Sequence, residues 1–229
     1  MTCKTVFATL AFLAGTTSAL AQDAVFRTIL GIDVSGSSTF LYEQASADAA
    51  ARYVHDYIAD LDTPHDLLMI SVGDPGLAQR AIDIRATVTE RRATSPEHMA
   101  GQFGGYFGAM PSLVQSGQLT ADDTTSLVAF FQSVEPICSS GSTRVILFSD
   151  GVEWSAEVDG RAFLDGAASL PAPTHEFLSG CYVELHGVGQ LKADLDSSGL
   201  EARLIPIWRD WMTAAGADSV RVTGSFFTF

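Results

Sequence analysis

The sequence predicts an α/β domain with a central, mostly parallel sheet, one antiparallel edge strand and helices on both faces. Apolar runs of strand length alternate along the chain with segments that keep helical spacing. One segment, residues 81–88, instead alternates apolar and polar residues with period two, as a half-exposed edge strand does. Polar turns follow two of the apolar runs, and ligands bind at such strand ends in parallel sheets.

The predicted strands are short apolar runs bounded by turn residues. They cover residues 26–33, 67–72, 143–149, 182–188 and 219–226. The first two runs are separated by a segment whose apolar residues recur on one helical face and which ends at Thr63-Pro64. Those apolar residues are Ala50, Tyr53, Val54, Tyr57, Ile58 and Leu61.

Three further helices are predicted. Ser95-Pro96 is typical of a helix start, but the glycines that follow weaken any long helix there, since glycine has a low helix propensity. Residues 125–134 read as a second helix. A third is predicted over residues 206–215, with Pro206 in its first turn and Gly216 just past its end.

Residues 1–21 are typical of a secretory signal, and residues 22–229 then form one domain. Lys4 supplies a positive start, an apolar stretch follows, and Ala19-Leu20-Ala21 fits a cleavage site. The apolar stretch is too short to cross a bilayer, and no later segment is long enough. We therefore expect a periplasmic or secreted protein with no transmembrane segment in the mature chain, and a retained N-terminal anchor is the alternative.

The net charge argues against some classes of ligand, and the cysteine content predicts a disulfide. The formal charge of −14 becomes −15 when Lys4 leaves with the signal, and such a surface repels nucleic acid and anionic lipid. Cys3 also leaves, so Cys138 and Cys181 remain. An even number of cysteines in an exported chain predicts a disulfide between them.

Two acidic turns predict a metal site. Asp33-Val34-Ser35-Gly36-Ser37 follows the first apolar strand, and Phe148-Ser149-Asp150-Gly151 ends a later one. Carboxylate and hydroxyl oxygens are the ligands that Mg²⁺ prefers, with Mn²⁺ or Ca²⁺ as alternatives. Neutral serine ligands leave the ion electrophilic, so it would seek an anionic ligand from outside.

These two motifs, in this order and each at a strand end, resemble the von Willebrand factor type A family over residues 26–226. The resemblance implies a metal-ion-dependent adhesion site in which Asp33, Ser35 and Ser37 hold the metal and Asp150 acts through water. It also implies a binding module, not an enzyme, that captures an Asp or Glu carboxylate of another protein.

The family also places a threonine at the metal, in a loop before the helix that precedes the second motif. Thr120 is the preferred match, because it lies at the predicted helix start, and Thr124 or Thr125 is the alternative. Trp154 and Gln190 follow strand ends on the same edge and are predicted to line the rim that contacts a partner. Trp154 could equally cover its own loop.

Other functions stay open at this point. Asp and Ser are ordinary turn and helix-capping residues, so the first motif alone could be a capped turn in a metal-free scaffold. A metal-assisted hydrolase that uses Asp33 and Asp150 is a second alternative, although the sequence shows no base beside them. The histidines are scattered, which argues against a zinc hydrolase. No G-x-S-x-G elbow and no phosphate-binding loop is present.

Overall fold

The computed structural model describes residues 26–72, 81–192 and 198–226. The predicted signal, residues 1–21, lies outside this part of the chain. The strands are β1 (Phe26–Asp33), β2 (His65–Val72), β3 (Asp83–Val88), β4 (Thr143–Phe148), β5 (Cys181–His186) and β6 (Ser219–Thr223). The helices are α1 (Gln44–Ala59), α2 (Pro96–Gly108), α3 (Met110–Gln115), α4 (Leu127–Ser133), α5 (Glu135–Cys138), α6 (Gly160–Leu164) and α7 (Leu200–Ala214), with 3₁₀ turns η1 (Thr39–Leu41) and η2 (Arg92–Thr94).

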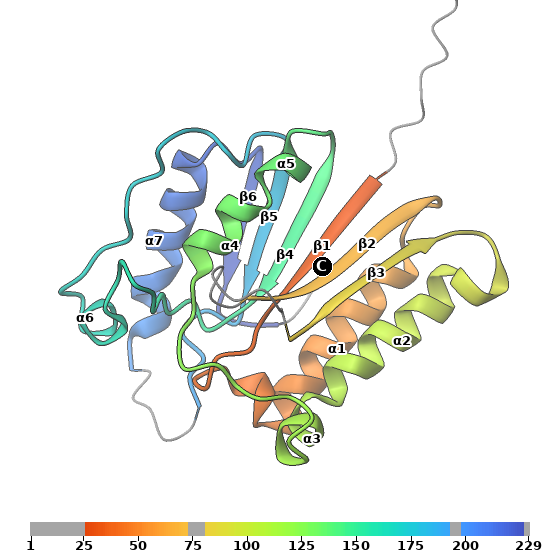
Figure 1. Ribbon diagram of the computed structural model, residues 1–229, viewed down its shortest axis with the longest axis horizontal. Coiled ribbons are helices and arrows are strands. Elements are labelled where there is room, and N and C mark those ends of the chain that lie inside the picture. The colour runs from red at the N-terminus through yellow and green to blue at the C-terminus, as the bar shows by residue number, and fades with distance from the viewer. Residues whose placement is uncertain (1–25, 73–80, 193–197, 227–229) are drawn as a thin grey trace, which may run out of the picture.

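The predicted α/β architecture is confirmed. The six strands form one sheet in the order β3-β2-β1-β4-β5-β6 (Figure 1). Every neighbouring pair is parallel except β2 and β3, which are antiparallel. The strand order reverses between β1 and β4, the position where sheets of this kind bind ligands.

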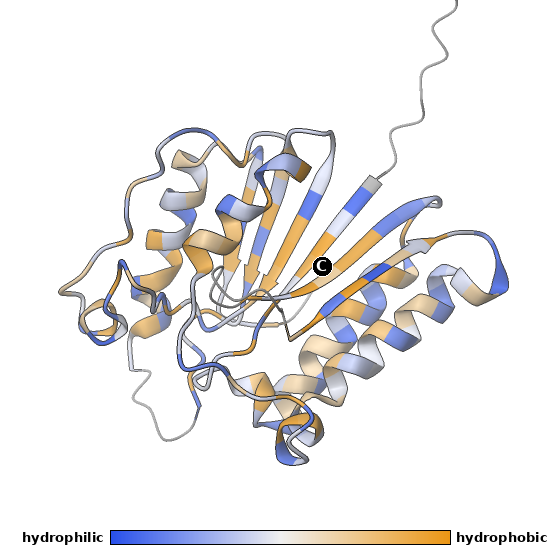
Figure 2. Ribbon diagram, in the orientation of Figure 1, coloured by the Kyte–Doolittle hydropathy of each residue, from blue (hydrophilic) through white to orange (hydrophobic). Residues whose placement is uncertain are grey.

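Helices cover both faces because alternate strand residues point to opposite sides of the sheet. In β1, Ile29 packs with residues of α4, α5 and α7, whereas Leu30 and Ile32 pack with residues of α1, α2 and α3. The central strands are apolar along most of their length (Figure 2), as expected for strands buried on both faces. These two cores hold the carboxyl ends of β1 and β4 in place.

Two helix predictions were wrong in extent. Helix α2 runs unbroken through its four glycines, because Gly104 packs directly against α1: a Cβ there would lie 3.0 Å from the Ala51 carbonyl oxygen. Helix α7 begins at Leu200, so Pro206 lies inside it and not in its first turn. Burial of Leu204 and Trp208 in the core outweighs the local cost of the proline.

The predicted disulfide is present. Cys138 at the end of α5 bonds Cys181 at the start of β5, with 5.1 Å between the Cα atoms. Both residues are buried in the core beneath α4 and α7. Within the described residues, no helix is both long and apolar enough to cross a membrane.

Candidate metal-binding site

The candidate site lies where the carboxyl ends of β1 and β4 meet. The two strands are parallel neighbours, and their register pairs Ile32 with Phe148. Asp33 and Ser149 therefore leave adjacent strands at the same edge of the sheet. Both Asp33 and Asp150 are almost completely buried, at 0% and 2% exposure. The two acidic motifs therefore lie side by side at this edge, where the Ser149 hydroxyl donates to Asp33.

The first turn gathers one carboxylate and two hydroxyls. The Ser35 N–H donates to Asp33 Oδ1 at 2.9 Å, which tightens the turn. The Ser35 and Ser37 hydroxyl oxygens then lie 3.2 Å apart. Capping is not the role of these serines: η1 begins after Ser38 without a side-chain cap. The capped-turn alternative therefore explains the orientation of Asp33 but not the pairing of the hydroxyls.

The second turn leaves a carboxylate oxygen unused. Asp150 Oδ1 accepts the Val152 N–H at 2.9 Å. Asp150 Oδ2 is buried, yet it has no hydrogen-bond partner among the described residues. Ser149 connects the two turns, because its hydroxyl donates to Asp33 Oδ2 at 2.6 Å. Since a buried polar atom is normally paired, Asp150 Oδ2 is available to accept a hydrogen bond from water or to bind a cation.

The two buried carboxylates repel each other. Burial and then the neighbouring Asp33 charge raise the pKa of Asp150 to about 7. The Val152 N–H opposes the rise, as does the nearby Ser37 hydroxyl, whose geometry falls short of a hydrogen bond to Asp150. Burial also raises the pKa of Asp33, against the hydrogen bonds from Ser149 and Ser35. In the described part of the chain, no ion pair joins either carboxylate to a basic side chain. A cation placed between them would keep both ionised.

The donor set fits a hard divalent cation. Two carboxylates, one of which has an unpartnered oxygen, and two hydroxyls are all oxygen ligands, and Mg²⁺ binds one or two carboxylates while it keeps several waters. No group of three or more His, Cys, Asp or Glu side chains suited to a metal occurs among the described residues. Neutral hydroxyls would therefore have to complete this site.

The loop expected to supply a threonine contacts the first turn through Asp122. The Gly36 N–H donates to the Asp122 carbonyl oxygen at 3.0 Å, and the Asp122 N–H donates to the Val34 carbonyl oxygen at 2.9 Å. Thr120 and Thr124 flank Asp122 on either side and are both exposed. Thr125 is buried, and its backbone pairs with that of Trp154. The role of Thr120 at the metal stays a prediction.

The two predicted rim residues differ in their surroundings. Trp154 is 46% exposed and borders a cleft of about 500 Å³ that contains Thr124 and Glu157. The Gln190 side-chain amide instead donates to the Gly224 carbonyl oxygen beyond β6. Trp154 is thus partly exposed while its ring lies against Gly160, and Gln190 is engaged within the domain; contact of either residue with a partner stays a prediction.

Sequence reasoning missed two residues that support the site. Ser149 lies inside the quoted second motif, but its bond to Asp33 depends on the neighbouring strand. Glu153 is buried at 1% exposure, and its Oε2 accepts the Val128 N–H at the start of α4. Burial raises the pKa of Glu153 above its ordinary value, against the opposing effect of the Ser155 hydroxyl and the α4 N–H groups. A helix N-terminus stabilises such a carboxylate, and the pairing holds the Asp150 turn against α4.

Comparison with known proteins gives structural likenesses only. No family model and no curated protein matches the chain. An aerotolerance-related membrane protein from Bacteroides fragilis NCTC 9343, solved with multiple mutations to serines, is 13% identical over 88% of this chain and 93% of its own, with a TM-score of 0.45. A von Willebrand factor type A protein from Catenulispora acidiphila is 13% identical over 84% of this chain and 42% of its own, with a TM-score of 0.40.

A further solved structure, proximal thread matrix protein 1 from the mussel byssus, is 14% identical. It covers 88% of this chain with a TM-score of 0.43, and the match spans 44% of the mussel protein. This chain therefore spans less than half the length of the mussel and Catenulispora proteins. All of these likenesses concern the arrangement of helices and strands.

Proposed function

We propose that this chain is an exported, non-catalytic binding module that uses a divalent metal, Mg²⁺ or alternatively Mn²⁺ or Ca²⁺, to capture a carboxylate of another protein. The observation that carries the proposal is the pair of buried carboxylates, Asp33 and Asp150, with one oxygen left unpartnered in the described structure. Asp33, Ser35, Ser37 and Asp150 would hold the ion, and Thr120 is the predicted further ligand.

The choice of binding over catalysis follows from the neutral ligands and from the surroundings. The metal would supply an electrophilic coordination position. This chain would supply the two hydroxyls, which would hold the ion without adding negative charge. It would also supply the exposed Trp154 near the site as a contact for the partner. Asp150, whose pKa burial raises to about 7, is buried and therefore poorly placed to exchange protons with a substrate.

Export is supported by the disulfide between Cys138 and Cys181, because such bonds persist in oxidising compartments. The acidic surface is unsuited to nucleic acid, so the proposed partner is a protein that presents an Asp or Glu side chain. The exported chain would be found in the periplasm or outside the cell.

Titration calorimetry with MgCl₂, after removal of metal with EDTA, tests the proposal. We expect saturable binding by the wild-type protein and none by the Ser35→Ala/Ser37→Ala variant, with an unchanged fold by circular dichroism. The matched control is Ser139→Ala/Ser140→Ala, which alters two exposed serines near the amino end of β4. Equal Mg²⁺ affinity in the wild-type and Ser35→Ala/Ser37→Ala proteins would exclude the site.

A screen of phosphate and carboxylate esters, with and without EDTA, separates the binding module from a hydrolase. We expect no metal-dependent turnover. Turnover that EDTA removes, and that Asp150→Asn abolishes, would favour the hydrolase instead.

A further inference from the structure

Strand β3 leaves one long side of the sheet open. Within the described residues it pairs with β2 alone, through a continuous register from Asp83 opposite Ile70 to Val88 opposite His65. Its side chains reach solvent: Arg85 is 77% exposed, Asp83 is 46% exposed, and Ile84 is one of the exposed large apolar residues at 36%. The strand has no proline and no bulge, and its two exposed charges, Asp83 and Arg85, have opposite signs, so they can attract a second copy of the same edge.

The register shows which backbone groups point outward. The Ser71 N–H donates to the Ile82 carbonyl oxygen at 3.0 Å, so these two residues form a hydrogen-bonded pair. Hydrogen-bonded and non-hydrogen-bonded pairs alternate in an antiparallel ladder. Ile84 therefore turns its N–H and C=O groups toward β2, whereas Asp83 and Arg85 turn theirs toward the open side.

We propose that this edge is a self-association site, at which β3 of a second copy of this chain pairs antiparallel about a two-fold axis at Ile84. Asp83 then lies opposite Arg85 of the second copy, and Arg85 lies opposite Asp83 of the second copy. Both are hydrogen-bonded pairs, because these are the residues with outward backbone groups. Ile84 lies opposite its own equivalent in a non-hydrogen-bonded pair, where facing side chains come closest.

Charge selects this register over its neighbours. Moving the axis to Asp83 would place two aspartates opposite each other, and moving it to Arg85 would place two arginines opposite each other. Opposite charges directly across an antiparallel ladder stabilise it, and like charges destabilise it. In the single chain Arg85 already binds Asp83, at 3.3 Å on the same face of the strand. The two-fold arrangement offers both residues a partner directly opposite.

The proposed pairing of two β3 strands would produce a closed dimer. A two-fold interface uses the same surface on both copies, so the pairing of two β3 edges ends the assembly there. Ile84 lies on the face of the sheet that carries α1 and α2, because neighbouring Ala86 and Val88 pack into that core. The apolar pair at the axis would therefore extend this core from one copy to the next. The inference is independent of the metal site.

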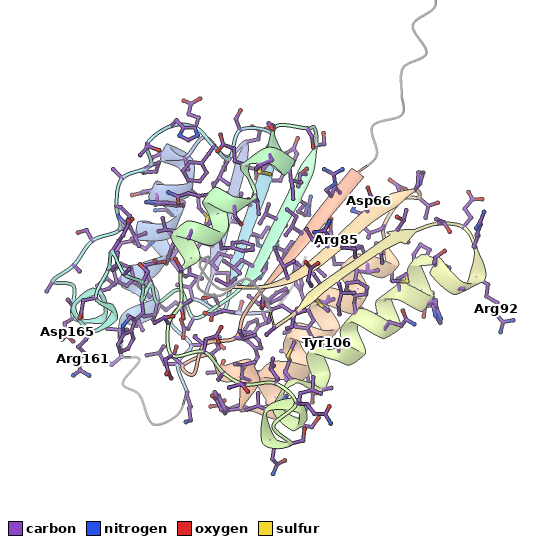
Figure 3. The ribbon with its side chains drawn as sticks, in the orientation of Figure 1. Asp66, Arg85, Arg92, Tyr106, Arg161 and Asp165 are labelled. Carbon is purple, nitrogen blue, oxygen red and sulfur yellow. A yellow bond between two sulfur atoms is a disulfide. The ribbon has the colours of Figure 1, made fainter. Side chains whose placement is uncertain are left out.

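Sedimentation equilibrium of the full-length protein across the micromolar range tests this edge. We expect the wild type to form a dimer. Arg85→Asp and Asp83→Arg should each weaken dimerisation at least about tenfold, because each reversal places like charges opposite each other at two positions of the ladder. The double reversal Asp83→Arg/Arg85→Asp should dimerise again, because it restores both opposite-charge pairs. The matched control is Arg161→Asp, which breaks the exposed Arg161–Asp165 pair of α6 on the far side of the molecule from Arg85 (Figure 3).

A cross-linking experiment tests the position of the axis. In a Cys3→Ser background, Ile84→Cys should form a disulfide-linked dimer on mild oxidation, because facing residues of a non-hydrogen-bonded pair lie within disulfide range. Arg85→Cys should not, since the two copies of residue 85 would be two positions out of register. A monomeric wild type, dimers unaffected by both single reversals, or a double reversal that stays monomeric would each overturn the proposal.

Discussion

Asp150→Asn should stabilise the metal-free domain at neutral pH, although it removes a predicted metal ligand. Asp150 has an ordinary pKa of 3.8 when unfolded and a pKa of about 7 when folded. Between these values the folded protein binds more protons than the unfolded chain, so the free energy of unfolding falls as pH rises. The difference of about 3 pH units corresponds to about 4 kcal/mol at pH 7.5 and above.

The amide should recover part of this free energy. Asparagine carries no charge to repel Asp33, and its side-chain oxygen can keep the bond from the Val152 N–H. Its new N–H groups would enter a buried position, which costs about 1–3 kcal/mol for any group left unpaired. We therefore expect a gain of about 1–3 kcal/mol at pH 7.5 in EDTA, or roughly 2–12 °C in melting temperature. Mg²⁺ should reverse the order, because only the wild type gains stability by binding it.

The assay is urea and thermal unfolding from pH 5 to pH 8, in EDTA and in MgCl₂. Asp210→Asn, which alters a carboxylate that is 77% exposed on α7, is the control and should follow the wild type. A wild-type stability that holds or rises with pH between pH 5 and pH 7 in EDTA would refute the reasoning. So would an Asp150→Asn protein that is less stable than the wild type in EDTA at pH 7.5.

Two further predictions concern the scaffold. Gly31→Ala should lower the free energy of unfolding by about 1–3 kcal/mol, because tightly packed cores resist added atoms. The added Cβ would lie 2.7 Å from both Leu147 Cδ1 and Phe130 Cζ. Urea unfolding measures the loss, and an unchanged stability would show that the core can relax. Reduction of the Cys138–Cys181 bond, which closes a loop of sequence separation 43, should cost about 4 kcal/mol of chain entropy in the unfolded state. Unfolding with and without reductant measures this cost, and Cys138→Ser/Cys181→Ser should match the reduced protein.

Much of the fold could be predicted from the sequence because strand burial and strand order leave local signatures. The period-two pattern of residues 81–88 identified the antiparallel edge, and the apolar runs identified the buried strands. Helix α2 could not be predicted in full, since the glycines that weaken it locally are tolerated through contact with α1. The start of helix α7 was predicted wrongly at Pro206 for the same reason, because burial of Trp208 is a tertiary effect that local propensity does not include.

The candidate site was predictable where its residues lie within motifs and unpredictable where they act across strands. Asp33 and Asp150 meet as expected, because both follow parallel neighbouring strands. The bond from Ser149 to Asp33 and the contact of Glu153 with α4 depend on three-dimensional packing, and a single sequence does not reveal them. The contact of Asp122 with the first turn joins segments far apart in the chain, and loop geometry sets it.

The loops around the site are joined mainly through backbone atoms, and this has an evolutionary consequence. Among the residues that the structure describes, three isolated bridges connect them: Ser35 with Asp122, Ser38 with Leu191, and Thr125 with Trp154. Backbone pairing places few demands on side-chain identity, so exposed residues such as Thr124 and Trp154 can change without moving Asp33 or Ser35. A lineage could therefore acquire new partners by substitution around an unchanged centre, in the way that binding loops diversify on a rigid scaffold.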